Sequence, residues 1–366
     1  MKFTCEKSLL SNTLSKAARS VSAKSTLPIL EGVLIKAEGS EIRITGYNME
    51  TGIIAVTEAN VESEGEIVVP AKMLVDIVRK LADDIVTVET GEDNVVNIAC
   101  GLSDFKIMGL EAEQFPKLPE FDKENSFTLK QDMLKSMLGR TLFSVSVNEN
   151  KIIHTGALFE LENGVLNIVA LDGFRMAVRR EKIESDISVR FVAPAPALRE
   201  LEHIIDGGED DVFIEMGGRH IQFTSQNTTI LSRLLDGDFL DYKKAIPTGQ
   251  TIIISSRVKE LLECVERVSL LVSDKIKNPV RMIIEENNIK LFLNTALGSA
   301  KDSCPCEGNG ENTEIGFNHK YLMDALKAAM PDERVKIKLS SSISPLIIEP
   351  EDNESYLFMV LPVRLK

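Results

Sequence analysis

The chain has 366 residues, a length that suits two or three domains rather than a single hydrophobic core. Its 43% hydrophobic and 27% charged residues are typical of a soluble globular protein. No apolar run is long enough to span a membrane, the start lacks the apolar segment of a secretory signal, and the five cysteines are scattered. We therefore expect a cytoplasmic protein with free thiols, and exclude the membrane and disulfide-rich secreted classes.

The first third of the chain predicts a strand, a helix and a hairpin in that order. Phe3-Thr4 is followed by a helical pattern around Leu9 to Ala18, and then by two alternating segments on either side of Glu38-Gly39-Ser40. A second strand, helix and hairpin follow, with strands at 66–70, 85–90 and 95–100.

The middle third repeats this order with clearer signals. Met133, Leu134, Met137, Leu138 and Leu142 have the spacing of one buried helix face. Two alternating segments, 156–161 and 165–171, are then joined through Asn163-Gly164, which is a strong signal for a tight hairpin. The same order of strand, helix and hairpin is repeated from Ile252, so that Phe3, Phe127 and Ile252 begin three similar units about 125 residues apart.

The predicted fold is therefore α+β, with three tandem copies of one domain, each with two helices packed on antiparallel sheets. Clusters of proline and charge at 116–125 and 245–249 place the domains at 1–122, 126–246 and 250–366. The economical packing puts both helices of a domain on one side, so three domains in a row form an arc that can close head to tail with a second copy.

The net charge of −14 is unevenly distributed. The predicted helices hold 15 of the 42 Lys/Arg but only eight of the 56 Asp/Glu, and they span 7–21, 71–82, 130–144, 195–205, 256–271 and 319–330. Such a distribution suits a protein whose helices face a polyanion while its sheets face solvent.

Three local motifs give the chain a family resemblance. They are Ser25-Thr26-Leu27-Pro28-Ile29-Leu30, Ala170-Leu171-Asp172-Gly173-Phe174-Arg175-Met176-Ala177-Val178 and the tail Met359-Val360-Leu361-Pro362-Val363-Arg364-Leu365. Together with the threefold repeat, they resemble the bacterial DNA polymerase III β subunit, the replicative sliding clamp, over the whole chain. The resemblance implies a homodimeric ring of six similar domains that encircles double-stranded DNA independently of its sequence. It also implies partnership with a clamp loader, with the polymerase III catalytic subunit and with other polymerases or repair proteins, and it implies no cofactor.

The resemblance further implies a peptide-binding pocket between the second and third domains. Its residues would be His154, Thr155, Leu171, Gly173, Phe174, Arg175, Met176, Leu240, Lys244, Ala245, Asn318, Tyr321, Ile343, Pro345, Met359, Val360, Leu361, Pro362, Val363 and Arg364. Phe174, His154 and Leu240 depart from residues common in the family. The alternative interpretation of 170–178 is an ordinary turn, because Asp172-Gly173 is a good turn pair.

Two further sets of residues follow from the family and from the basic helices. The set expected to contact DNA comprises Lys24, Asn148, Lys151, Lys72, Arg79, Lys80, Lys135, Arg140 and Arg199, each of which could instead be a solvated surface residue. The set expected at the dimer interface comprises Phe105, Ile107, Leu271 and Val272, with Lys72 and Asp302 as charges at its rim. The alternative for Phe105 and Ile107 is that they fill their own core.

Other chemistry finds little support in the sequence. Cys304-Pro305-Cys306 has neither the spacing nor the second pair of a zinc site, and phosphate-binding loops and nucleophile elbows are missing. We expect a non-enzymatic processivity factor. The alternatives are a scaffold built from repeats that binds only proteins and, with less support, a metal-dependent nuclease.

Overall fold

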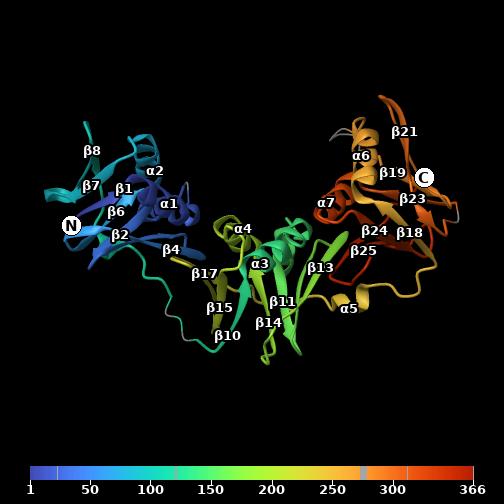
Figure 1. Ribbon diagram of the computed structural model, residues 1–366, viewed down its shortest axis with the longest axis horizontal. Helices are drawn as coiled ribbons and strands as arrows, with labels where there is room; N and C mark the ends of the chain where they lie inside the picture. The colour runs from blue at the N-terminus through green and yellow to red at the C-terminus, as the bar shows by residue number, and fades with distance from the viewer. Residues whose placement is uncertain (23, 120, 122, 273–277, 311, 366) are drawn as a thin grey trace. The chain divides into compact units, whose positions relative to one another are not determined.

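The structure is a computed structural model that describes residues 1–22, 24–119, 121, 123–272, 278–310 and 312–365. Its elements follow the order strand, helix, strands, helix, strands three times along the chain (Figure 1). The predicted α+β class with three tandem copies is therefore confirmed. Every helix in these residues is too short or too polar to cross a membrane.

The helices begin close to where the sequence predicts and end earlier. They are α1 (Lys7–Ala17), α2 (Ala71–Lys80), α3 (Gln131–Gly139), α4 (Ala195–Ile204), α5 (Tyr242–Ala245), α6 (Val258–Ser269) and α7 (His319–Ala329). The predicted helix 130–144 ends at Gly139, and the Thr141 hydroxyl there donates to the carbonyl of Met137 at 2.8 Å. A separate 3₁₀ turn, Leu142–Ser144, then carries Leu142 into the core. The apolar spacing thus predicted burial correctly beyond the point where the α-helix stops.

Grouping by contacts gives two compact units, Met1–Leu134 with Pro196–Leu234, and Lys135–Ala195 with Leu235–Lys366. The chain passes between the two units three times within the middle third. The boundaries predicted from the sequence at 1–122, 126–246 and 250–366 stay a prediction.

The first unit contains two antiparallel sheets, ordered β5-β1-β7-β8-β9 and β10-β15-β16-β17-β4-β3-β2-β6. Helix α1 packs on β3 and β4 and against α2. The strands are β1 (Lys2–Glu6), β2 (Gly32–Glu38), β3 (Glu41–Tyr47), β4 (Thr51–Glu58), β5 (Asn60–Ser63), β6 (Gly65–Pro70), β7 (Ile85–Thr90), β8 (Val95–Cys100), β9 (Ser103–Met108), β10 (Asn125–Lys130), β15 (Asp211–Gly217), β16 (His220–Ser225) and β17 (Thr228–Arg233).

The second unit also contains two sheets, ordered β14-β11-β12-β13-β26-β25-β24-β18-β22 and β21-β20-β19-β23. Helices α6 and α7 pack against each other, and α6 also lies on β20 and β21. The strands are β11 (Gly156–Glu162), β12 (Val165–Leu171), β13 (Arg175–Lys182), β14 (Val189–Pro194), β18 (Ile252–Arg257), β19 (Val280–Ile284), β20 (Asn288–Thr295), β21 (Gly298–Pro305), β22 (Glu307–Gly308), β23 (Thr313–Phe317), β24 (Arg334–Leu339), β25 (Leu346–Pro350) and β26 (Tyr356–Val360).

The predicted hairpin of the middle third is present with the predicted turn. Glu162 pairs with Val165, which leaves Asn163 and Gly164 as the two turn residues. Their φ angles are 53° and 71°, the left-handed values that a two-residue turn of this kind requires and that Asn-Gly adopts at low cost.

The nine-stranded sheet joins the middle and last thirds of the chain through the pairing of β13 with β26. Met176 lies opposite Met359, and Arg175 lies opposite Val360. This junction brings the motif at 170–178 beside the tail motif.

Candidate functional site

The junction of β13 and β26 carries most of the residues expected to bind partner peptides, and all of them lie in the second unit. Leu171, Met176 and Met359 are buried in one apolar cluster, and Leu361 packs against it. The backbone N–H of Leu361 donates to the carbonyl of Phe174 at 2.8 Å, so the tail motif is hydrogen-bonded to the turn after β12. The two motifs therefore form one surface, which we call the junction surface.

The turn between Leu171 and Met176 is organised by Asp172. Its carboxylate accepts hydrogen bonds from the backbone N–H groups of Phe174 at 2.8 Å and Arg175 at 3.0 Å. Gly173 between them has φ of 91°, which favours glycine. The interpretation of this segment as a turn is therefore correct, and the turn also presents the residues of the predicted pocket.

Arg175 connects this turn to helix α7. Its guanidinium donates to Asp172 at 3.0 Å and to Asp324 at 2.5 Å, and its side chain is only 12% exposed. The same guanidinium carbon lies 4.6 Å from the ring centroid of Tyr321, within the range of a cation–π contact. The Phe174 ring also stacks on the Tyr321 ring, with 6.0 Å between the ring centroids.

Several large apolar side chains of the predicted peptide pocket stay exposed. Phe174 is 59% exposed, Leu240 48%, Ile343 77% and Val363 41%. Exposed apolar groups beside a buried apolar cluster are typical of a surface that binds another chain.

His154 and the short helix α5 border the apolar cluster. The His154 ring meets the Phe239 ring edge to face at 5.4 Å, and burial, with a smaller contribution from the charge of Lys151, lowers the pKa of His154 below its usual value. Tyr242 in α5 donates to Glu160 at 2.6 Å, which fixes the segment that carries Lys244 and Ala245.

The remaining predicted members are spread around this centre. The side-chain amide oxygen of Asn318 caps α7 by accepting a hydrogen bond from the backbone N–H of Lys320 at 3.0 Å. Val360 is buried, Arg364 is exposed, and Thr155, Pro345 and Pro362 are half-buried.

Sequence reasoning missed three parts of this arrangement. Asp324 and Phe239 carry no local signal, because their roles depend on contacts with residues distant in the sequence. Asp172 was recognised only as a turn former, although its position three residues before Arg175 could have indicated an ion pair.

The residues expected to contact DNA differ in how they are held. Lys24 and Asn148 are exposed in connecting segments, and Lys151 is exposed in the 3₁₀ segment Glu149–Thr155. Helix α2 exposes Lys72, Arg79 and Lys80, α4 exposes Arg199, and Lys135 is half-buried on α3.

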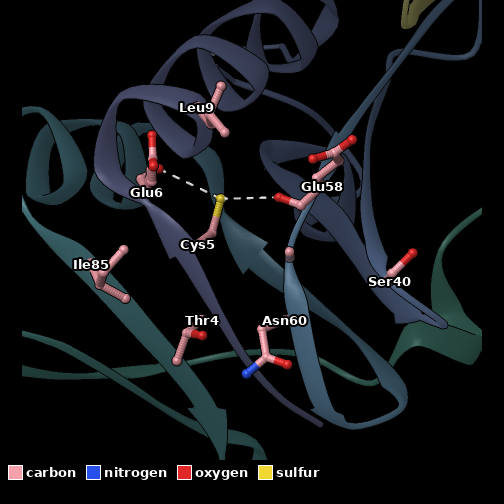
Figure 2. Close-up of a pocket in the computed structure, with 9 residues that line it drawn as sticks. Thr4, Cys5, Glu6, Leu9, Ser40, Glu58, Asn60 and Ile85 are labelled. Carbon is pink, nitrogen blue, oxygen red and sulfur yellow. Dashed lines mark hydrogen bonds between the residues drawn. The ribbon is translucent and has the colours of Figure 1, made fainter.

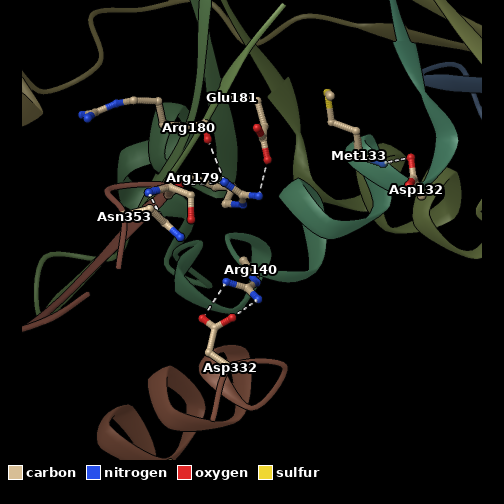
Figure 3. Close-up of polar contacts among 9 residues, drawn as sticks. Asp132, Met133, Arg140, Arg179, Arg180, Glu181, Asp332 and Asn353 are labelled. Atoms are coloured by element: carbon tan, nitrogen blue, oxygen red, sulfur yellow. Dashed lines mark hydrogen bonds and ion pairs between the residues drawn. The ribbon is translucent and has the colours of Figure 1, made fainter. Parts of the chain in front are cut away.

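Arg140 has a structural role that the sequence did not predict. Its side chain is 13% exposed, and its two terminal nitrogens each donate to Asp332 at 3.2 Å (Figure 3). Its guanidinium carbon also lies 4.7 Å from the ring centroid of Tyr356. The guanidinium is thus already bidentate with a carboxylate, and the expected contact of Arg140 with phosphates stays a prediction.

Some of the residues expected at the dimer interface lie on the edge strands of the two smaller sheets, and Lys72 is exposed on α2. Phe105 is 38% exposed on the edge strand β9, whereas Ile107 is 9% exposed and belongs to the core of the first unit. The alternative that these residues fill their own core thus applies to Ile107. Leu271 and Val272 follow α6 and are half-buried, and Asp302 on β21 accepts from Arg267 at 2.5 Å.

A separate hollow of about 580 Å³ lies in the first unit, between β1, β5, β7 and α1. Figure 2 shows Cys5 at its centre, with its thiol donating to the carbonyls of Glu6 and Glu58 at 3.5 Å each. Burial raises the pKa of this thiol, so Cys5 is poorly suited to nucleophilic chemistry. Nowhere in the described ranges do three or more His, Cys, Asp or Glu side chains gather as metal ligands would.

Known proteins match this chain along its whole length. Models of the DNA polymerase III beta subunit match in order, the N-terminal domain at residues 1–119, the central domain at 128–241 and the C-terminal domain at 243–364. The beta sliding clamp of Staphylococcus epidermidis is 30% identical over 375 aligned residues, covering 100% of this chain and 99% of the relative.

Solved structures of DNA polymerase sliding clamps also match this chain over its full length. The DNA polymerase sliding clamp of Bacillus subtilis has 28% identity and a TM-score of 0.96, with both chains covered fully at 100%. The clamp of Pseudomonas aeruginosa, solved bound to griselimycin, has 29% identity and a TM-score of 0.95, again with 100% of both chains covered.

Proposed function

The chain belongs to the family of DNA polymerase III beta subunits, which are DNA sliding clamps, and we propose that it works as a head-to-tail homodimeric ring around duplex DNA. In this function the ring is a processivity factor that holds polymerases on their template. Its activity is topological, and no catalytic step is needed.

The observation that carries the ring proposal is a pair of open sheet edges. The five-stranded sheet ends at β9 and the four-stranded sheet ends at β21, and within the described residues neither strand pairs on its outer side. Open edges with exposed apolar side chains invite pairing with another chain. Pairing β9 of one copy with β21 of the next would continue both sheets and would cover Phe105.

The DNA-facing role is supported by the basic helices. Lys72, Arg79 and Lys80 are exposed together on one helix, α2, as side chains that contact phosphates must be. Contacts of this type fix no base sequence, which suits a protein that has to move along the duplex. Lys24, Asn148, Lys151, Lys135 and Arg199 complete the proposed DNA set.

The junction surface is proposed to bind peptides of partner proteins. Its exposed Phe174, with the exposed Leu240 and Ile343 of the predicted pocket, would offer contact area to the apolar anchors of an extended peptide, and Met176 and Met359 would give an adaptable floor. The partners would be the polymerase III catalytic subunit, the clamp loader and other polymerases or repair proteins. We place these interactions in the cytoplasm, where bacterial DNA is replicated.

Sedimentation velocity tests the dimer. The wild type should sediment as a particle of twice the 40.5 kDa chain mass, and Phe105→Asp should sediment as a monomer because it places a charge at the proposed interface. Phe213→Asp is the matched control, since Phe213 is 51% exposed on β15, inside a sheet rather than at its edge. A wild type that stays monomeric at micromolar concentration, or equal behaviour of the two variants, would contradict the proposal.

A further inference from the structure

Helix α6 packs along the edge strand β21, and the two elements are antiparallel, so that later residues of the helix contact earlier residues of the strand. Arg267 donates to Asp302 at 2.5 Å. One turn later on the helix, the Leu271 side chain reaches within 3.9 Å of the position a Cβ would take on Gly298, at the start of the strand. In the other direction, Cys264 is one turn before Arg267, and Cys304 is two residues after Asp302 on the same face of β21. The two cysteines therefore lie opposite each other.

The structure agrees with this geometric argument. Cys264 is 0% exposed and Cys304 is 3% exposed, and both belong to the core of the last third of the chain. Each thiol is also the group that most strongly shifts the pKa of the other, raising that of Cys264 and lowering that of Cys304, as expected of neighbouring side chains. Facing side chains of a helix packed on a strand can reach the Cβ separation of about 3.5–4.5 Å that a disulfide requires.

The other three cysteines have different partners. Cys5 donates to two backbone carbonyls, Cys100 donates to the carbonyl of Ala82 at 3.6 Å, and Cys306 donates to the carbonyl of Glu285 at 3.6 Å. All five are free thiols. Cys264 and Cys304 are thus the pair that the fold places for reaction with each other.

We propose that Cys264 and Cys304 are a redox modification site, at which a hydroperoxide converts the two thiols into an intramolecular disulfide between α6 and β21. In the reducing cytoplasm the pair would stay as thiols, and the bond would form under peroxide stress.

Cys304 is the thiol that reacts first. The neighbouring Cys264 side chain, with a smaller contribution from Ser256, lowers the pKa of Cys304 in spite of its burial, which favours its thiolate. The Cys304 thiolate attacks one peroxide oxygen, the O–O bond breaks, and hydroxide (or an alkoxide) leaves, giving a sulfenic acid. Cys264 then loses its proton and attacks the Cys304 sulfur, so that the S–S bond forms and the S–O bond breaks with release of water. Two thiols are oxidised by two electrons, and hydrogen peroxide is reduced to two waters.

The bond would join α6 covalently to the strand that the proposed ring uses as its edge. This consequence rests on the proposed homodimer, whereas the disulfide itself does not. A cross-link between the helix and β21 restricts local opening of that edge, so we expect slower exchange of subunits between rings after oxidation.

Peptide mapping after treatment with hydrogen peroxide tests the site. Thiols titrated in denaturant should fall from five to three. Non-reducing digestion with trypsin should show the peptide containing Cys264 joined to the peptide containing Cys304, and dithiothreitol should separate them. A bond between Cys304 and Cys306, a bond between two chains, or loss of Cys5 and Cys100 at the same rate would overturn the proposal.

Two variants place the bond by residue. Cys306→Ser should keep the cross-link, because the Cys306 thiol donates to a backbone carbonyl and not to another cysteine. This variant also leaves Cys304 as the one cysteine in its tryptic peptide. Cys264→Ser should stop at the sulfenic acid, which dimedone would trap on Cys304. Trapping on Cys306 would overturn the order of attack.

Subunit exchange is measured separately by mixing rings that carry different fluorophores. Unchanged exchange in a protein with the mapped disulfide would refute the consequence for the ring edge and leave the modification site intact. A monomeric wild type would instead refute the proposed ring, and the mapping result would be unaffected.

Discussion

Replacing Arg175 by alanine removes the group that connects the turn after β12 to helix α7. In the wild type this guanidinium meets two carboxylates and the face of Tyr321, and its side chain is 12% exposed. The variant leaves Asp172, itself 13% exposed, without its cationic partner.

The magnitude of the effect follows from the surroundings of each contact. Loss of the partner of the mostly buried Asp172 carboxylate costs about 1–3 kcal/mol, although the two backbone N–H donors remain and favour the lower half of that range. The contact with Tyr321 adds about 1 kcal/mol. Asp324 is 42% exposed, so that pair adds about 0–1 kcal/mol. We expect the free energy of unfolding of the second unit to fall by about 2–4 kcal/mol.

Urea titration followed by circular dichroism measures this change, with Arg190→Ala as the matched control. Arg190 is 49% exposed and lies 3.7 Å from Glu160, so its removal should cost less than about 1 kcal/mol. Equal midpoints for the two variants would refute the reasoning, because they would show that the Arg175 network contributes no more than an exposed ion pair.

Three further predictions address binding and pH. Phe174→Ala should weaken a partner peptide about tenfold in fluorescence polarisation with little change in stability, because the ring is 59% exposed and rests on Tyr321. The neutral form of His154 is favoured in the folded state, so stability should fall as pH drops below the usual pKa of 6.5, where the unfolded chain takes up the proton first. His154→Gln should lose less stability than the wild type in urea titrations across that range. The double change Arg79→Ala with Lys80→Ala should reduce the slope of log affinity for DNA against log salt by up to about 2.

Each of these three predictions has an outcome that contradicts it. Unchanged peptide affinity for Phe174→Ala would remove that ring from the junction surface. An identical loss of stability at low pH in His154→Gln would assign the pH dependence to other groups. The control for the basic helix is Lys36→Ala with Arg43→Ala, two exposed residues paired across β2 and β3, and an equal loss of DNA affinity there would mean that α2 has no special role.

Local features of the fold could be read from the sequence because their causes are local. The turn at Asn163-Gly164 and the helix face from Met133 to Leu138 depend on the residues' own conformational preferences and spacing. The end of α3 at Gly139 was not predicted, because apolar spacing continues through the following 3₁₀ turn.

The site was predictable only in part. Family motifs indicated Arg175 and Tyr321 but could not show that they contact each other or Asp324, since these residues come from different thirds of the chain. Arg140 was assigned to DNA from its place on a basic helix, whereas Asp332, 192 residues later, binds its guanidinium. Charge patterns along a sequence show which residues are cationic, and only the folded chain shows which cations already have a partner.

The central claim is encirclement, and retention on circular DNA tests it most directly. The protein would be loaded onto a nicked circular plasmid by a clamp loader with ATP, isolated at high salt, and measured before and after the plasmid is linearised. The ring account predicts retention on the circle at high salt and release when the DNA is cut. Equal loss from circular and linear DNA as salt rises would contradict the account, because it would indicate ordinary electrostatic binding to a basic surface.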